Sequence, residues 1–289
     1  MNERTSSIKI RVGHLEFVKV NANRQDARDL YHWTLTLTWF QFAGLILVIY
    51  LAVNLGFSVL YFMGRDCIAE SHSFADDFFF SVETIATVGY GHLYPQTLYG
   101  HIISTIEIMT GMFGMAVTSG LIFIRFSRPM ARILFSRNLV VSPFDGKPAL
   151  RLRVANLRHH AMAEAEFRLM LIRKIRIKEG EEVRRFYPLS LEFDRLIAFP
   201  VALTLRHIID EKSPLYGLTA RDLEECGARV LASVVCIDTV ISATVQSPQE
   251  YTWKDIQFGK RFVEIYCELD DHRMTVDYGR LHEIEDVPS

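Results

Sequence analysis

The chain has 289 residues, with 32 basic and 34 acidic side chains and a formal net charge of -2. This balance excludes a strongly basic nucleic-acid-binding protein, and the 49% of apolar residues excludes a disordered one. Four cysteines without C-x-x-C spacing argue against a zinc site or a disulfide framework.

The first long apolar segment covers residues 35–63 and carries no charged side chain. A helix needs about 20 apolar residues to cross a bilayer. The segment therefore predicts a transmembrane helix over 35–63, with aromatic residues toward its ends at headgroup level.

A second apolar segment covers about residues 99–126 and is interrupted by Glu107 and Arg125. It predicts a spanning helix that faces protein or water on one side. Between the two segments, residues 74–87 are amphipathic but too short to cross. They predict a re-entrant half-helix buried among other helices.

Basic residues are unevenly distributed around these segments. Six precede the first span and four follow the second, whereas the connecting stretch 64–98 carries only Arg65. The positive-inside rule then predicts both chain ends in the cytoplasm and the connecting stretch outside. We expect a multi-pass membrane protein.

Residues 138–289 contain short alternating apolar and polar segments separated by turn residues. Several short strands at this spacing predict a β-sandwich. The segment has no nucleotide-binding motif, no nucleophile elbow and no histidines at metal-ligand spacing. We therefore expect no enzymatic activity.

The string Thr87-Val88-Gly89-Tyr90-Gly91 directly follows the half-helix. The two glycines allow backbone angles that would strain other residues, so successive carbonyls can point to one side. The string resembles the selectivity filter of potassium channels. The resemblance implies that those oxygens, with the Thr87 hydroxyl, replace the water shell of K⁺, which we place at Thr87, Val88, Gly89 and Tyr90. Because one filter cannot enclose an ion, the resemblance implies a homotetramer.

Further segments resemble inward-rectifier potassium channels, in particular their bacterial group. They are residues 125–129, 156–158, 210–216, 258–262 and 276–282, and the similarity covers about residues 26–285. The resemblance implies a fold of two transmembrane helices with a re-entrant pore helix and filter, followed by an immunoglobulin-like β-sandwich that forms a cytoplasmic pore.

The resemblance also divides the chain into three parts. Residues 1–34 form a cytoplasmic N-terminus with an interfacial slide helix at 26–33. Residues 35–129 form the pore domain, and residues 130–289 form the cytoplasmic sandwich.

Glu83 lies four residues before Thr87, behind the filter. A carboxylate at that depth must be paired, hydrogen-bonded or protonated. We expect Glu83 and Thr84 to support the filter, with a solvated loop acid as the alternative. Many animal relatives pair this acid with an arginine two positions past the filter, where this chain has Leu93, preceded by His92.

Glu107 is expected to face water or protein, because lipid exposure would be costly, and we assign it with Met115 to the pore cavity. Met115 stands where strongly rectifying relatives carry an acid, which predicts weaker block by internal Mg²⁺ or polyamines. The alternative for Met115 is packing against a neighbouring helix.

Phe123 is expected to form an apolar gate on nearly the same helix face as Met115. Gly111 and Gly120 are expected hinges, with close packing as the alternative.

No cofactor is expected beyond the permeant K⁺ ions, and Ba²⁺ is a further expected blocker.

Basic residues flank both spans and are expected to bind anionic, phosphoinositide-like lipid, at about 1 kcal/mol each. They are Arg24, Arg28, Arg125, Arg128, Arg132 and Arg137. The alternative is that these arginines only set the topology of the chain in the membrane and bind no specific lipid.

In the sandwich, Glu164 and Asp194 correspond by resemblance to acids that ring the cytoplasmic vestibule, although each could be a solvated strand-edge charge. His159 and His160 are expected to be exposed loop imidazoles rather than pH sensors.

We therefore expect a potassium-selective channel of the inward-rectifier type. The alternatives are a non-selective cation channel, which should depart from the Gly-Tyr-Gly pattern, and a membrane-anchored sandwich that recruits a partner, which needs neither the filter threonine nor the half-helix.

Overall fold

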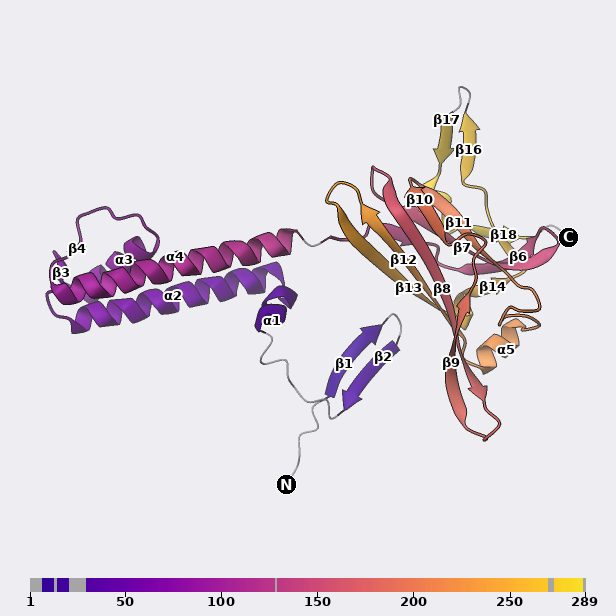
Figure 1. Cartoon of the computed structure of the whole chain (residues 1–289), viewed down its shortest axis with the longest axis horizontal. Coiled ribbons are helices and arrows are strands. Elements are labelled where there is room, and N and C mark those ends of the chain that lie inside the picture. Colours follow the sequence, from indigo (N-terminus) through magenta and orange to yellow (C-terminus); the bar gives the residue numbers. More distant parts are fainter. Residues whose placement is uncertain (1–6, 13–14, 21–29, 128, 270–272, 288–289) are drawn as a thin grey trace. The chain divides into compact units, whose positions relative to one another are not determined.

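The computed structural model describes residues 7–12, 15–20, 30–127, 129–269 and 273–287. The chain divides into two compact units, one of residues 20–128 and one of residues 7–19 with 129–289 (Figure 1). The split lies next to the predicted boundary at residue 129. Residues 7–19 group with the second unit and not with a separate N-terminal part; they contain the strand β1 (Ser7–Val12) and all but the last residue of its partner β2 (Leu15–Val20).

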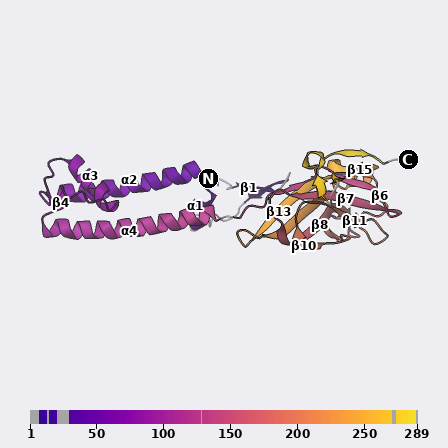
Figure 2. The same cartoon turned by 90° about the horizontal axis from the view of Figure 1, so that it is seen from above.

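The first unit is mainly helical in its described part, with one short strand pair. Its elements are α1 (Leu30–Thr36), α2 (Trp39–Met63), β3 (Ile68–Ala69), α3 (Phe74–Ile85), β4 (Tyr94–Pro95) and α4 (Leu98–Phe126). Helices α2 and α4 are long and apolar enough to cross a membrane. They run side by side, with α3 at one end of the pair (Figure 2).

The first span begins later than the apolar segment predicts. Thr38 caps α2: its hydroxyl accepts from the Gln41 N–H, and the Gln41 side chain accepts from the Thr38 N–H. This capping box starts a new helix at Trp39, and Leu35 belongs to α1 instead. The predicted span 35–63 is therefore corrected to Trp39–Met63, because hydropathy does not register a cap.

The half-helix predicted over 74–87 is present as α3. Its N-terminus is capped by Ser73, whose hydroxyl accepts from the Asp76 N–H. Phe80 packs edge-on against Tyr61 of α2, with ring centroids 5.1 Å apart. This packing holds α3 against the first span.

The last turn of α3 lies against α4 at Gly111. A Cβ on Gly111 would stand 2.9 Å from the carbonyl oxygen of Ile85 and 3.3 Å from its Cα. Only a residue without a side chain allows this approach. Gly111 is therefore in close packing contact, which was the alternative to a hinge at this position. A Cβ on Gly120 would meet nothing within 4 Å, so no such contact is present there, and the hinge at Gly120 stays a prediction.

The second unit is built on two five-stranded sheets. The first sheet has the order β10 (Arg195–Phe199), β8 (Met162–Arg176), β12 (Arg229–Asp238), β13 (Ala243–Thr252), with β9 (Glu182–Leu189) also paired to β8. The second has the order β11 (Ala202–Ile208), β7 (Lys147–Asn156), β6 (Leu139–Phe144), β14 (Ile256–Phe258), with β5 (Ile133–Phe135) also paired to β7. All these pairs are antiparallel except the parallel pair β14 and β6.

Smaller elements complete this unit. They are α5 (Ala220–Glu225), the pair β15 (Lys260–Phe262) and β18 (Ile284–Asp286), and the pair β16 (Tyr266–Leu269) and β17 (Arg273–Val276).

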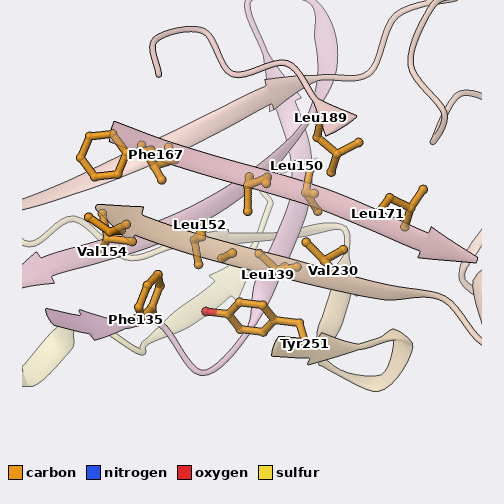
Figure 3. Close-up of a cluster of buried hydrophobic side chains, with 14 of the residues drawn as sticks. Phe135, Leu139, Leu150, Leu152, Val154, Phe167, Leu171, Leu189, Val230 and Tyr251 are labelled. Carbon is orange, nitrogen blue, oxygen red and sulfur yellow. The ribbon is translucent and has the colours of Figure 1, made fainter. Parts of the chain in front are cut away.

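The core of the second unit lies between the two sheets (Figure 3). Along β12 every second residue is buried, from Val230 to Cys236, which is the period of a strand with one face in a core. Tyr251 enters from β13, and its hydroxyl donates to the Ser136 carbonyl at 2.7 Å. The predicted combination of two spanning helices with a C-terminal β-sandwich is confirmed.

Replacing Gly111 by alanine should destabilise the protein by about 1–3 kcal/mol, because the new methyl group meets main-chain atoms of Ile85 that cannot rotate away. The measurement is the thermal unfolding midpoint of the full chain in detergent. Gly44→Ala on α2 is the control, since a Cβ there meets nothing within 4 Å. A midpoint for Gly111→Ala at or above that of the parent would contradict the contact.

Candidate functional site

The backbone of residues 87–91 alternates in handedness. Thr87, Gly89 and Gly91 have φ of 57°, 56° and 84°, whereas Val88 and Tyr90 between them are not in the positive-φ region. Such alternation turns successive N–H groups to one side and carbonyls to the other. Thr87 holds this angle without being glycine, which is a strained conformation that the surroundings must impose.

The amide side of this segment is tied to α3. The Val88 N–H donates to the Glu83 carbonyl at 2.9 Å, and the Thr87 N–H donates to the Thr84 carbonyl at 3.1 Å. Within the part of the chain that the structure describes, no donor reaches the carbonyl oxygens of residues 87–90. The segment thus offers a row of free acceptors.

Main-chain oxygen is the ligand type that an alkali cation needs. Among the described residues, no group of His, Cys, Asp or Glu side chains could hold a metal ion. Val88 is 51% exposed and Tyr90 75% exposed, so one subunit leaves this segment open. The carbonyl row at 87–90 is therefore the candidate cation site.

Glu83 lies behind this segment, with a mostly buried side chain. Its Oε2 is 3.9 Å from the His92 Nδ1, which is too long for a hydrogen bond but within reach of an ion pair when the imidazole is protonated. Leu93, at the position where the resemblance implies an arginine in animal relatives, is buried in an apolar cluster with Tyr61 and Phe80. In this chain the neighbour of Glu83 is therefore His92.

The prediction that Glu107 lines the pore cavity is wrong. The residue is 0% exposed within one subunit, between α2, α3 and α4. Its Oε2 lies 2.5 Å from the Tyr61 hydroxyl, and its Oε1 is hydrogen-bonded to the Ser81 hydroxyl. A carboxyl group taken out of water needs hydrogen-bond partners, and Glu107 finds them in neighbouring helices, so the carboxyl faces protein.

Two further polar residues at this place were missed from the sequence. Asn54 and Ser58 are buried in α2, where the Asn54 Oδ1 lies 3.1 Å from the Ser81 hydroxyl and the Ser58 hydroxyl donates to the Asn54 carbonyl. Polar residues within an otherwise apolar span are expensive unless they have partners. That signal could have identified Asn54.

Met115 and Phe123 lie on an exposed side of α4 within one subunit. No described residue of the same chain packs over these two side chains. The assignments of Met115 to the cavity and of Phe123 to the gate stay predictions.

The prediction that Arg125 binds lipid is corrected by its contacts. Its two Nη atoms donate to the carbonyls of Thr34 and Leu37, each at 2.8 Å. Its guanidinium lies over the rings of Trp39 and Phe42, at 4.8 and 4.5 Å from their centroids. Arg125 thus satisfies carbonyls left free at the end of α1 and ties α1 to α4.

The other predicted lipid contacts divide into two groups. Arg24, Arg28 and Arg128 lie outside the described residues, as does the beginning of the predicted slide helix, of which α1 contains the later part. Arg132 and Arg137 are exposed.

The two predicted vestibule acids are both exposed in the second unit. Glu164 has φ of 49° where the pairing of β8 with β12 shifts register between Val235 and Ile237. Such a bulge re-aims a side chain out of the regular alternation. Asp194 anchors its segment by accepting the Phe167 N–H at its carbonyl.

The prediction that both loop histidines are simply exposed is wrong for His160. Its Nε2 lies 3.1 Å from the Oδ1 of Asp238, which is only 2% exposed and also 3.6 Å from the Arg158 Nε. Burial raises the pKa of Asp238, but hydrogen bonds from the Val240 N–H and the His160 ring outweigh it and hold that pKa below its ordinary value. Asp238 is therefore an ionised anchor for the loop.

Replacing Arg125 by lysine should release α1, because one ammonium cannot donate to both carbonyls in the fork geometry or stack in the same way. We expect amide exchange in α1 to accelerate by about tenfold or more, the effect of losing a charge-assisted hydrogen bond. Hydrogen exchange with mass spectrometry measures it. Arg221→Lys on exposed α5 is the control; equal protection of α1 in both variants would contradict the role of Arg125.

Two family descriptions match the chain. "Ion channel" matches residues 37–128, and "Inward rectifier potassium channel C-terminal domain" matches residues 133–289. The first match includes the filter segment and both spans, and the second includes the sandwich.

Curated relatives agree with these matches. The inward rectifier potassium channel Kirbac3.1 of Paramagnetospirillum magnetotacticum is 39% identical over 258 residues, which are 89% of this chain and 88% of that protein. The G protein-activated inward rectifier potassium channel 1 of Homo sapiens is 32% identical over 238 residues, 77% of this chain and 46% of that protein. The ATP-sensitive inward rectifier potassium channel 12 of Mus musculus is 32% identical over 237 residues, 77% of this chain and 54% of that protein.

The chain thus spans about half the length of these two animal relatives. The family consists of membrane-embedded ion channels and not of enzymes. With a family description matching more than half of the chain and a bacterial relative aligned along nearly all of it, the chain belongs to the inward rectifier potassium channel family.

Proposed function

We propose that four copies of this chain form a pore that conducts K⁺ passively down its electrochemical gradient. The observation that carries the proposal is the alternation of φ at Thr87, Gly89 and Gly91, which leaves the carbonyls of residues 87–90 without donors. Four such rows around an axis supply the oxygens that replace the hydration shell of the ion.

The tetramer follows from what one subunit leaves open. The filter segment and the α4 side that carries Met115 and Phe123 are exposed in the isolated chain, although both are apolar in part. Exposed apolar residues of this kind on a spanning helix are covered by another protein surface or by lipid. Copies of the same chain arranged around an axis would cover it and complete the filter.

The end of α3 adds an electrostatic contribution. The C-terminus of a helix carries roughly half a negative charge. The last carbonyls of α3 lie immediately before the filter, at residues 82–84. Four such ends directed to the pore would favour a cation at the centre of the bilayer.

Selectivity for K⁺ is supported by Tyr90 between two glycines, the pattern that a non-selective filter would lack. The family match does not favour either alternative, since it covers both the pore domain and the sandwich. We infer that Glu83 and Thr84 support the filter through the hydrogen bonds that their carbonyls accept.

Access to the filter is controlled, in this proposal, by an apolar constriction of four Phe123 rings and by the cytoplasmic sandwich. Met115 at the cavity would attract Mg²⁺ or polyamines poorly, so rectification is weak. Glu164 and Asp194 are the acids that remain around the vestibule in this proposal. Because fewer acids concentrate fewer cations there, block by cations is weaker and rectification is reduced further.

We further propose an inner-membrane location with both chain ends in the cytoplasm, supported by the distribution of basic residues around the spans. Anionic lipid acts through the basic residues outside the spans, including Arg132 and Arg137, which are exposed.

Liposomes that contain the purified chain should take up Rb⁺, exclude Na⁺ and be blocked by Ba²⁺. The filter carbonyls match the size of K⁺ and Rb⁺, and Ba²⁺ carries twice the charge into the same site. Tracer flux measures all three. Uptake of Na⁺ equal to that of Rb⁺, or no uptake, would reject potassium selectivity.

Replacing Phe123 by alanine should raise resting Rb⁺ flux, because removing the rings lets water and ions through the constriction. Phe113→Ala is a matched control: the two side chains are 69% and 70% exposed on the same helix. Ten residues correspond to about 15 Å along the helix, so Phe113 lies well away from the proposed constriction. Flux that stays at the parental value in Phe123→Ala would place the gate elsewhere.

A further inference from the structure

Four polar side chains meet in the apolar interior of the first unit. Asn54 and Tyr61 come from α2, Ser81 from α3 and Glu107 from α4, and all four are buried. Buried polar groups need hydrogen-bond partners, and these four lie within hydrogen-bond distance of one another. Each hydrogen and each lone pair in the cluster can therefore be assigned.

The orientation of Asn54 is fixed by the backbone. Its Nδ2 donates to the Tyr50 carbonyl at 2.7 Å, and only the nitrogen of an amide can donate to a carbonyl. The atom that lies 3.1 Å from the Ser81 hydroxyl is therefore Oδ1, which only accepts. Ser81 must supply the hydrogen of that bond.

The Ser81 hydroxyl has one hydrogen but stands between two oxygens, the Asn54 Oδ1 and the Glu107 Oε1. The Tyr61 hydroxyl supplies its own single hydrogen to the other carboxyl oxygen of Glu107, at 2.5 Å. An ionised Glu107 would leave Ser81 one hydrogen for two acceptors, so one close pair of oxygens would face each other without a hydrogen.

A neutral Glu107 completes the set. Its Oε1–H donates to Ser81, Ser81 donates to Asn54, and Tyr61 donates to the Glu107 Oε2. Every donor then has an acceptor and every contact has a hydrogen.

The charges around the cluster agree with this assignment. Within the described chain, no basic side chain lies at ion-pair distance from Glu107. The titratable group in contact with Glu107 is Tyr61 on α2, and the further titratable neighbours of Tyr61 are Cys67 beyond α2 and Asp77 on α3; none of the three carries positive charge. An ionised Glu107 would therefore be a buried charge without a counter-ion.

We propose that Glu107 holds a proton in the folded channel and that the neutral carboxyl positions α3, and through it the filter, by way of Ser81. Ser81 lies two residues before Glu83, whose carbonyl accepts the Val88 N–H. Glu107 also lies one helical turn from Gly111, which touches the last residue of α3. Glu107 is thus a positioning residue, and its ionisation would loosen the support of the filter.

The protonation is tested by infrared spectroscopy of the full-length channel in lipid. At neutral pH we expect a carbonyl band of a protonated carboxylic acid in the parent that is absent in Glu107→Gln. If that variant fails to assemble, parental protein labelled with ¹³C-glutamate shows the same band displaced by the isotope. Only carboxylate bands from glutamate at neutral pH would overturn the proposal.

The positioning role is tested by the pH profile of Rb⁺ flux. As pH rises, Glu107 loses its proton. The single Ser81 hydrogen can then be donated to Asn54 or to Glu107 but not to both, so one hydrogen bond of the cluster is lost. Flux should fall by about tenfold, as expected for one buried hydrogen bond. Glutamine reproduces the neutral acid, with Nε2 donating to Ser81 and Oε1 accepting from Tyr61. Glu107→Gln should therefore keep the neutral-pH flux and lose the alkaline decline.

Asp77→Asn is the matched control, because this neighbouring acid of α3 is bonded by the Ser71 hydroxyl and not by Ser81. It should keep the parental pH profile. An alkaline decline that persists unchanged in Glu107→Gln would overturn the positioning role. The flux experiment rests on the proposed conduction of K⁺, whereas the infrared experiment does not, so the two failures are distinguishable.

Discussion

The structure depends on one constraint: residues 87–90 must hold their carbonyl oxygens together and leave them without donors. A backbone normally pairs these groups, and unpaired carbonyls cost free energy until a ligand occupies them. The chain meets the constraint by fixing the opposite side of the segment, where Thr87 and Val88 donate to carbonyls at the end of α3. The strained φ of Thr87 is then imposed by its neighbours.

The position of α3 is fixed in turn by both spans. Phe80 packs on Tyr61, the glycine at 111 admits the Ile85 backbone, and Ser81 joins Asn54 on one side to Glu107 on the other. These contacts combine dispersion, close backbone approach and hydrogen bonding. A rigid pore helix is what allows a short ribbon to present oxygens at a fixed spacing.

The sequence was sufficient for features set by local chemistry. The absence of charge over a long segment marks a span, an amphipathic segment too short to cross marks α3, and alternation marks the strands of the sandwich. It was insufficient where the partner is distant: Arg125 bonds carbonyls 91 and 88 positions away, Glu107 bonds Ser81 26 positions away, and His160 bonds Asp238 78 positions away. A basic residue beside a span looks the same whether it binds lipid or caps a helix, so only the fold distinguishes them.

The central claim is that four ribbons share their main-chain oxygens with dehydrated cations along one axis. Crystals of the assembled channel grown in Rb⁺ test it most directly, since anomalous scattering locates the ions without reference to the protein. The account predicts Rb⁺ on a four-fold axis, enclosed by the carbonyls of residues 87–90. An assembly without that axis, or an axis without ions at this level, would contradict it.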